Sequence, residues 1–140
     1  MERQMNILLV EDNNLDAMMI ERALGKVAPV SVVHRAVDGI HALELISSGQ
    51  VPYPFFVLLD INMPRMNGHE FLGELRASSQ ASDSMVFMFT TSDSAQDIAK
   101  AYSERVNGYI VKPQTKDGMK KIIETLQGFW TTCEPPLHMV

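Results

Sequence analysis

The sequence predicts an α/β fold in which one parallel sheet of five strands is covered by helices on both faces. Five short apolar runs alternate with stretches in which apolar residues recur at helical spacing. Several of these runs are apolar almost throughout, which is typical of strands buried on both faces. The chain has 140 residues, of which 46% are hydrophobic. This is enough for a single domain with a full core.

Each apolar run has about the length of a strand and is too short to be a typical helix. The first, third and fourth runs are continuously apolar apart from Asn6. The predicted strands are Met5–Val10, Val30–Arg35, Phe55–Leu59, Met85–Phe89 and Gly108–Val111.

Between these runs, apolar residues recur every three or four positions, as on one face of a helix. Asn13 or Asn14 is the expected N-cap of the first helix. The last helix has the clearest pattern, and it must begin after Pro113 and end before Pro135.

Alternating strands and helices with right-handed crossovers form either an open, doubly wound sheet or a closed barrel. Five units are too few for an eight-stranded barrel. We therefore expect a flavodoxin-like sheet with strand order 2-1-3-4-5, whose site lies beyond the carboxyl ends of the strands. Residues 1–131 should form this domain and residues 132–140 a C-terminal tail.

Composition excludes several classes of function. Twelve basic and 17 acidic residues give a net charge of −5, and no basic block is present, so direct binding to nucleic acid is not expected. The single cysteine, Cys133, excludes a disulfide framework and suits a reducing cytoplasm. No signal peptide or membrane-spanning run is visible, so no membrane association is expected.

Polar side chains follow four of the predicted strands, where the strands end at one edge of the sheet. A Glu-Asp pair after a strand is most often an ordinary helix start, and a Lys-Pro pair is most often a loop. Four such ends at the same edge instead favour a site. The residues at these ends are Glu11, Asp12, Asp60, Thr90 and Lys112.

Three neighbouring carboxylates repel one another, so either one of them keeps a proton at a raised pKa or a cation neutralises them. Ligands that are all oxygen point to a hard ion, and Mg²⁺ prefers one or two carboxylates together with water and a phosphate oxygen. A carboxylate beside Mg²⁺ can attack phosphorus and form an aspartyl phosphate. Lys112 and Thr90 would then contact the phosphoryl oxygens.

These motifs resemble the receiver domain of two-component response regulators, the CheY-like family. The resemblance covers about residues 5 to 130 and is carried by Ile7–Asn13, Leu58–Gly68, Phe89–Ser92 and Gly108–Pro113. It implies a signalling protein that accepts a phosphoryl group from a sensor histidine kinase. Such a protein is not an enzyme in the ordinary sense, because it catalyses only its own phosphorylation and dephosphorylation.

The same resemblance implies roles for residues of the acidic site. Asp60 corresponds to the phosphorylated aspartate and would also contact Mg²⁺. Asp12 would bind Mg²⁺ directly, Glu11 would act nearby through water, and the backbone carbonyl of Asn62 would be a further ligand.

Further roles follow from the resemblance around this site. Thr90 would be the switch hydroxyl and Tyr109 the switch aromatic. Lys112 would pair with the phosphoryl group, and the resemblance implies a cis peptide bond between Lys112 and Pro113. Gly68 would occupy the tight turn that opens the third helix.

A narrower resemblance is to the small stand-alone regulators associated with bacterial phytochromes. It rests on the Thr-Thr-Ser motif together with Asp97–Ile98, Ala101–Tyr102 and Phe129–Trp130. It implies a phytochrome-type kinase as donor, and a downstream protein or His-phosphotransfer domain as the next partner. The aromatic residues fit the core and an exposed patch equally well. If exposed, they would suit a partner or a homodimer on the face of the fourth helix, strand 108–111 and the last helix.

Three alternatives compete with the phosphorylation switch. A phosphate-independent interaction module would usually lack one of the acidic residues or the lysine, and this sequence keeps them all. A hydrolase with an aspartyl intermediate would need an acid at position 62, which is Asn62. A flavin carrier would need a phosphate-binding loop where Glu11 and Asp12 stand, and these would repel the phosphate.

Overall fold

A computed structural model describes residues 4–136 and shows strands and helices in strict alternation. The strands are β1 (Asn6–Val10), β2 (Val32–Ala36), β3 (Phe55–Leu59), β4 (Met85–Thr90) and β5 (Gly108–Val111). The helices are α1 (Asn14–Val27), α2 (Gly39–Ser47), α3 (Gly68–Ala77), α4 (Ala95–Ser103) and α5 (Lys116–Thr132). None of the helices in residues 4–136 is long and apolar enough to span a membrane.

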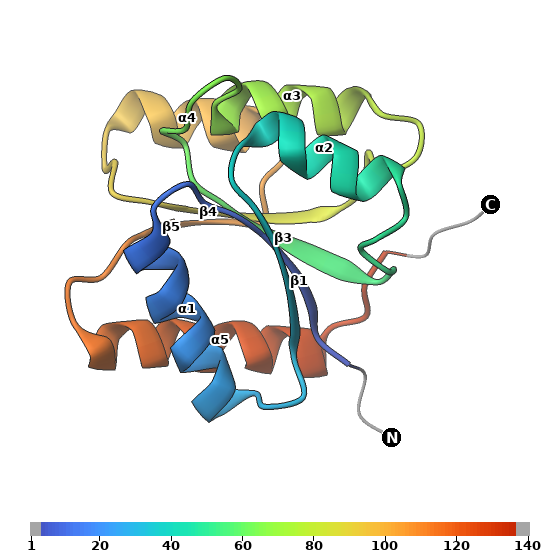
Figure 1. Ribbon diagram of the computed structural model, residues 1–140. Coiled ribbons are helices and arrows are strands. Elements are labelled where there is room, and N and C mark those ends of the chain that lie inside the picture. Colours follow the sequence, from blue (N-terminus) through green and yellow to red (C-terminus); the bar gives the residue numbers. More distant parts are fainter. Residues whose placement is uncertain (1–3, 137–140) are drawn as a thin grey trace.

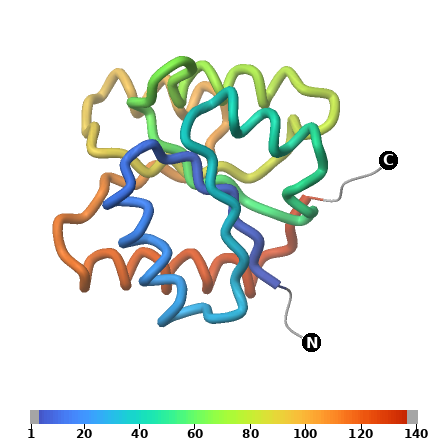
Figure 2. The backbone as a smooth tube through the Cα atoms, in the orientation of Figure 1, coloured from blue at the N-terminus to red at the C-terminus, as the bar shows by residue number. Residues whose placement is uncertain are grey.

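The strands form one parallel sheet in the order β2-β1-β3-β4-β5, which confirms the predicted topology. Figure 1 shows α1 and α5 on one face of the sheet and α2, α3 and α4 on the other. In Figure 2 the chain enters the second helix layer with α2 and returns to the first layer only with α5. In the register, Val10 pairs with both Ala36 and Leu59, so β1, β2 and β3 end level with one another.

The predicted strands agree with the structure to within two residues at each end. Only the second is displaced, because Val30 lies in a turn with 60% of its surface exposed, whereas Ala36 is fully buried and completes β2. Asn13 is the N-cap of α1, and its side chain accepts a hydrogen bond from the backbone N–H of Asp16. The last helix ends at Thr132, one residue beyond the expected domain boundary, while residues 1–3 and 137–140 lie outside the described part of the chain.

Each face of the sheet has its own hydrophobic core. Phe71, Leu72 and Leu75 of α3 are fully buried in one core, and Ile20 of α1 and Trp130 of α5 in the other. Because both faces are covered, the central strands carry apolar residues at nearly every position.

The sequence did not decide whether Tyr102, Phe129 and Trp130 lie in the core or on the surface, and the structure places them differently. Trp130 is 1% exposed. The Phe129 ring packs edge-on against Phe87, with the ring centroids 5.3 Å apart. Phe129 and Trp130 therefore both belong to the core. Tyr102 on α4 keeps 51% of its surface exposed. Of the three aromatic residues, only Tyr102 is therefore available for an exposed apolar patch.

Candidate functional site

The carboxylates predicted to form the site meet at the carboxyl ends of β1 and β3. The backbone N–H of Asp60 donates to the Val10 carbonyl at 3.0 Å, and that of Glu11 donates to the Ala36 carbonyl at 2.9 Å. These bonds extend the sheet pairing one residue past each strand. One carboxylate oxygen from each of Glu11, Asp12 and Asp60 lies within 4.8 Å of the other two. Glu11 and Asp60 are buried, and Asp12 is exposed.

Lys112, which follows β5, extends its ammonium group into this acidic cluster. Its Nζ lies 2.7 Å from Glu11 Oε1 and 3.3 Å from Asp60 Oδ2. A third contact, 2.8 Å to Oδ2 of Asp16 on α1, was not predicted from the sequence. Asp16 lies in the first turn of α1, three residues after the N-cap Asn13, and no sequence pattern singled it out.

The close charges shift two pKa values. Burial raises the pKa of Glu11 from 4.5 to about 7, and the negative charge of Asp60 contributes to the rise, against the opposing effect of Lys112. Burial alone would lower the pKa of Lys112, but its hydrogen bonds to Asp16 and Glu11 and the charge of Asp60 outweigh burial and raise it above its ordinary value. The Lys112 ammonium therefore stays charged, whereas the Glu11 carboxylate takes up a proton near neutral pH.

Backbone N–H groups hold two of the acidic side chains in place, and Arg35 holds the backbone of Glu11. Arg35 on β2 donates from Nε and Nη2 to the Glu11 carbonyl at 3.1 and 3.0 Å. The N–H of Asn13 donates to Glu11 Oε2 at 3.2 Å, and the N–H of Ile61 donates to Asp60 Oδ1 at 2.8 Å. Asp60 thus has one oxygen fixed by its own loop and the other beside Lys112. Arg35, which positions the backbone of Glu11, was not among the site residues predicted from the sequence.

Gly68 is the first residue of α3 and lies directly against the Asp60 loop. Its N–H donates to the Ile61 carbonyl at 2.8 Å. A Cβ at this position would overlap the carbonyl oxygen of Asp60 and would lie 2.9 Å from Cα of Ile61. The loop that carries Asp60 can therefore approach α3 this closely only because residue 68 has no side chain.

The two predicted switch residues lie on β4 and β5. Thr90 is the last residue of β4 and is fully buried, and its carbonyl accepts from the Lys112 N–H at 2.8 Å. The Tyr109 hydroxyl donates to the Ser92 carbonyl at 2.8 Å. Tyr109 thus contacts the loop that follows Thr90, and their roles in switching stay predictions. Asn62 is exposed two residues after Asp60, and its role as a backbone ligand likewise stays a prediction.

The predicted cis bond before Pro113 is wrong. Among residues 4–136 the cis peptide bond is Tyr53–Pro54, so the Lys112–Pro113 bond is trans. The trans form is the more stable one for most X–Pro bonds, by about 0.5–1 kcal/mol. Lys112 reaches all of its carboxylate partners from this trans backbone.

The donor set at this edge fits a hard divalent cation. The three clustered groups are all carboxylates, and the exposed Asp12 leaves one side open to solvent. Mg²⁺ favours such a site, because it keeps several waters and takes few protein ligands. Calcium sites usually enclose the ion with more protein oxygens than this cluster offers.

A doubly wound sheet of this order, with clustered acids after β1 and β3 and a lysine after β5, is the arrangement expected of a receiver domain. The chain belongs to the response regulator receiver domain family, whose profile matches residues 7–124. Receiver domains are signalling modules of two-component systems, and the sequence-based assignment to this family is confirmed.

Three known proteins are similar to this chain in sequence or in structure. The probable methanogenesis regulatory protein FilR2 of Methanothrix harundinacea is 36% identical over 127 residues, which are 89% of this chain and 82% of that protein. The crystal structure of the phosphorylated cyanobacterial phytochrome response regulator RcpA has a TM-score of 0.88 at 28% identity, covering 96% of this chain and all of that one. The bacteriophytochrome response regulator AtBRR has a TM-score of 0.72 at 33% identity, covering 94% and 99% of the two chains.

The raised pKa of Glu11 predicts a pH-dependent stability in metal-free buffer. Between 4.5 and about 7 the folded protein holds a proton at Glu11 that the unfolded chain has released, so stability falls as pH rises through this window. One pKa unit corresponds to about 1.4 kcal/mol, and we expect a loss of the order of 2 kcal/mol, measured by denaturant unfolding from pH 5 to pH 8.

Substitution of Glu11 tests the origin of this pH dependence. Glu11→Gln should flatten the profile, whereas Glu21→Gln, at an exposed position of α1, should leave it unchanged. Asp38 and Asp97 have lowered pKa values, so their contributions change only below their ordinary value of 3.8, outside the measured range. An unchanged slope in Glu11→Gln would show that another group titrates.

Proposed function

We propose that this receiver domain is a phosphorylation switch in which Asp60 accepts a phosphoryl group from a sensor histidine kinase in a reaction that requires Mg²⁺. The observation that carries the proposal is the clustering of carboxylates from Glu11, Asp12 and Asp60, two of which, Glu11 and Asp60, also contact the ammonium group of Lys112. One ammonium group offsets only part of the charge of the three carboxylates, so the cluster can still bind a divalent cation. A site of this kind, open to solvent on one side, suits the transfer of a dianionic group, which depends mainly on positioning and charge neutralisation.

In the proposed transfer, an oxygen of Asp60 attacks the phosphorus of a phosphohistidine. The new bond joins this oxygen to phosphorus, the phosphorus–nitrogen bond breaks, and its electron pair goes to the imidazole nitrogen, which takes up a proton from water. Asp60 Oδ2 is the candidate oxygen, because Oδ1 accepts the hydrogen bond from Ile61 and Oδ2 lies beside Lys112. Mg²⁺, held by Asp12, Asp60 and the Asn62 carbonyl with Glu11 nearby, would supply charge neutralisation.

Lys112 and Thr90 would respond to the new phosphoryl group. Lys112 would shift its contacts from the carboxylates to the phosphoryl oxygens, which are stronger acceptors. Thr90 would donate its hydroxyl to the same group, and Tyr109 would turn inward after it, giving up its contact with the Ser92 carbonyl. Each change favours a second arrangement of the β4–α4 loop, and the phosphoryl group thereby shifts the population between two states.

The altered surface would be the α4–β5–α5 face, and the output would be contact with another protein in the cytoplasm. Tyr102 on α4 and Val111 on β5 are 51% and 45% exposed there. A downstream protein, a His-phosphotransfer domain or a second copy of the chain would bind this face. The similarity to RcpA and AtBRR supports a phytochrome-type kinase as the donor.

The experiment that tests the proposal measures intact mass after incubation with a small phosphodonor, with and without Mg²⁺. We expect one Mg²⁺-dependent phosphoryl adduct in the unaltered protein. Asp60→Asn should form none, while Asp83→Asn, at an exposed position before β4, should react normally. An Asp60→Asn variant that still forms the adduct would place the acceptor elsewhere.

The competing function, a phosphate-independent interaction module, predicts a different result. It requires neither an adduct nor Mg²⁺ binding, although the fold is intact. An absent adduct together with measurable Mg²⁺ binding would instead indicate a site that only a particular kinase can phosphorylate.

A further inference from the structure

Apart from the acidic site, the molecule has a hollow between α1 and α5, on the face of the sheet opposite α2, α3 and α4. It has a volume of about 270 Å³. Its apolar lining comes from Met19 and Ala23 of α1 and Met119 of α5, of which Ala23 and Met119 are buried. None of these residues belongs to the acidic site or to the switch residues.

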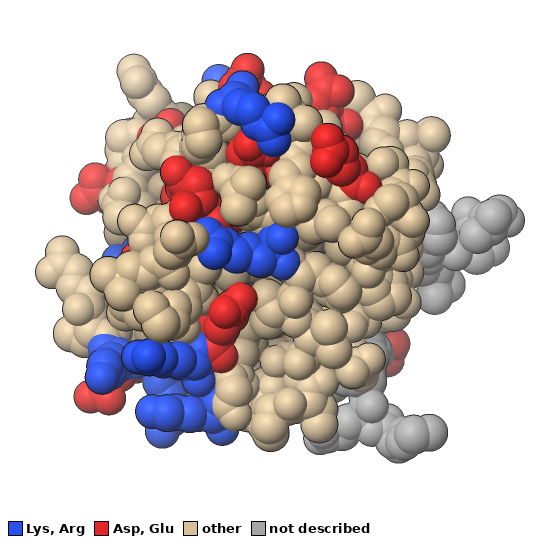
Figure 3. All heavy atoms as spheres, viewed as in Figure 1, with Lys and Arg blue, Asp and Glu red and all other residues tan. Residues whose placement is uncertain are grey.

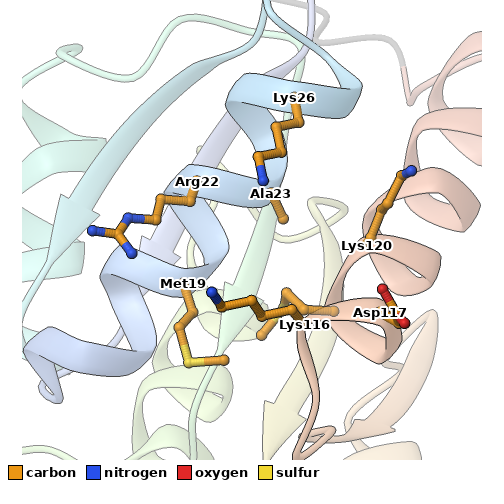
Figure 4. Close-up of a pocket in the computed structure, with 8 residues that line it drawn as sticks. Met19, Arg22, Ala23, Lys26, Lys116, Asp117 and Lys120 are labelled. Atoms are coloured by element: carbon orange, nitrogen blue, oxygen red, sulfur yellow. The ribbon is translucent and has the colours of Figure 1, made fainter.

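Four basic side chains line this hollow, two from each helix: Arg22, Lys26, Lys116 and Lys120. Figure 4 shows Lys116 reaching from α5 across the gap toward α1, and Lys26 extending from α1 toward the same space, whereas the guanidinium group of Arg22 points away from α5. Asp117 is the one acidic residue in the lining. The lining therefore carries a formal charge of 4 − 1 = +3 in a chain whose net charge is −5. In Figure 3 a group of blue side chains lies at the lower left, where Figure 1 shows α1 and the beginning of α5.

The basic side chains of this α1–α5 pocket are largely uncompensated. Within residues 4–136, no carboxylate lies within 4.0 Å of the cationic groups of Arg22, Lys26 or Lys116. Lys120 has only a long contact of 4.0 Å with Glu124 on the exposed surface of α5. Like charges gathered around one hollow repel each other, and a bound anion would remove this repulsion.

We propose that the α1–α5 pocket binds a small free compound with two or more adjoining phosphate groups, such as a nucleoside diphosphate. Lysine and arginine bind phosphate oxygens through charge-assisted hydrogen bonds. Adjoining phosphates would match the ammonium groups of Lys26 and Lys116, which extend toward the gap from the two helices. The hollow, at about 270 Å³, is slightly smaller than most small-molecule sites, which suits a small ligand, and its apolar lining offers a surface to the non-phosphate part of that ligand.

The first measurement is titration calorimetry of the full chain with ADP and with inorganic tripolyphosphate, in buffer containing EDTA so that no metal bridges the phosphates. We expect both probes to bind. Lys116→Gln should weaken binding by about tenfold, which corresponds to the loss of one charge-assisted hydrogen bond. Lys121→Gln is the matched control, because it removes the same charge from a neighbouring exposed position of α5 that does not line the pocket.

Lys116→Gln also separates binding from folding. Lys116 is the first residue of α5, where a positive charge opposes the helix dipole, so its removal should not lower the thermal midpoint. Lys26→Gln provides a second variant on the other helix and should weaken binding similarly. Asp60→Asn should bind both probes normally, so failure of the phosphorylation proposal would leave this result unaffected.

Three outcomes would overturn the proposal. The first is that neither probe binds at millimolar concentration. The second is that Lys121→Gln weakens binding as much as Lys116→Gln does. The third is that the pocket binds another kind of anion in preference to these probes. The last is tested with hexaglutamate peptide and with phosphatidylglycerol vesicles. Binding of either one without binding of ADP or tripolyphosphate would assign the pocket to an acidic protein segment or to a lipid surface. Binding of tripolyphosphate but not ADP would support the phosphate site and restrict it to inorganic polyphosphates.

Discussion

Gly68→Ala is expected to abolish Mg²⁺-dependent phosphorylation of Asp60 and to lower the free energy of unfolding by about 3 kcal/mol. The added Cβ would overlap the carbonyl oxygen of Asp60 and press on Cα of Ile61 at 2.9 Å. Both obstacles are backbone atoms, so no side-chain rotation can relieve the overlap. Either α3 or the loop carrying Asp60 must move, and the loop is the less constrained of the two because α3 is packed into the core through Phe71 and Leu75.

Gly73→Ala on the same helix is the matched control. Gly73 lies in the interior of α3, and a Cβ there would meet no atom within 4 Å. Alanine favours helix over glycine, so this variant should gain about 0.5–1 kcal/mol and phosphorylate normally. Denaturant unfolding and intact mass of both variants check the prediction. Equal behaviour of the two would mean that α3 and the Asp60 loop are not in the contact described.

Lys112→Met should lower the free energy of unfolding by about 3 kcal/mol at pH 8 without metal, the usual cost of leaving buried charges unpaired. The ammonium lies within 3.3 Å of carboxylates from Glu11, Asp16 and Asp60, and the side chain is 8% exposed. Its removal leaves three negative groups to repel one another. At pH 5.5 the cost should shrink, because Glu11, whose pKa is already raised to about 7, takes up a proton.

Addition of Mg²⁺ should restore most of the stability lost in Lys112→Met. A ligand that binds only the folded state stabilises it by mass action, and in this variant no ammonium competes for the carboxylates. Asp16→Asn added to Lys112→Met should recover part of the loss without metal, because it removes one uncompensated charge. Lys121→Met, at an exposed position of α5, is the control and should change stability little. A loss that persists at saturating Mg²⁺ would contradict the picture of a cation-neutralised cluster.

The order of elements and the place of the site could be predicted without the structure. Alternating apolar runs and helical spacing leave few topologies for a chain of this length, and a parallel sheet brings the carboxyl ends of its strands to one edge. Glu11, Asp12, Asp60 and Lys112 could therefore be placed together from their positions after three of the strands. The second strand was displaced because periodicity does not distinguish an apolar residue in a turn, such as Val30, from one in a strand.

The amino-acid sequence by itself determined the doubly wound fold and the edge at which the acidic residues and Lys112 meet, because strand and helix periodicities specify faces and ends. The resemblance to receiver domains came from the motifs at that edge. Only the tertiary structure decided that Lys112 also contacts Asp16, that the bond before Pro113 is trans, and that Trp130 is buried while Tyr102 is exposed. The same holds for the basic pocket between α1 and α5. These features depend on contacts between residues far apart in the chain, or on peptide isomers separated by about 1 kcal/mol, and neither leaves a periodic pattern in the sequence.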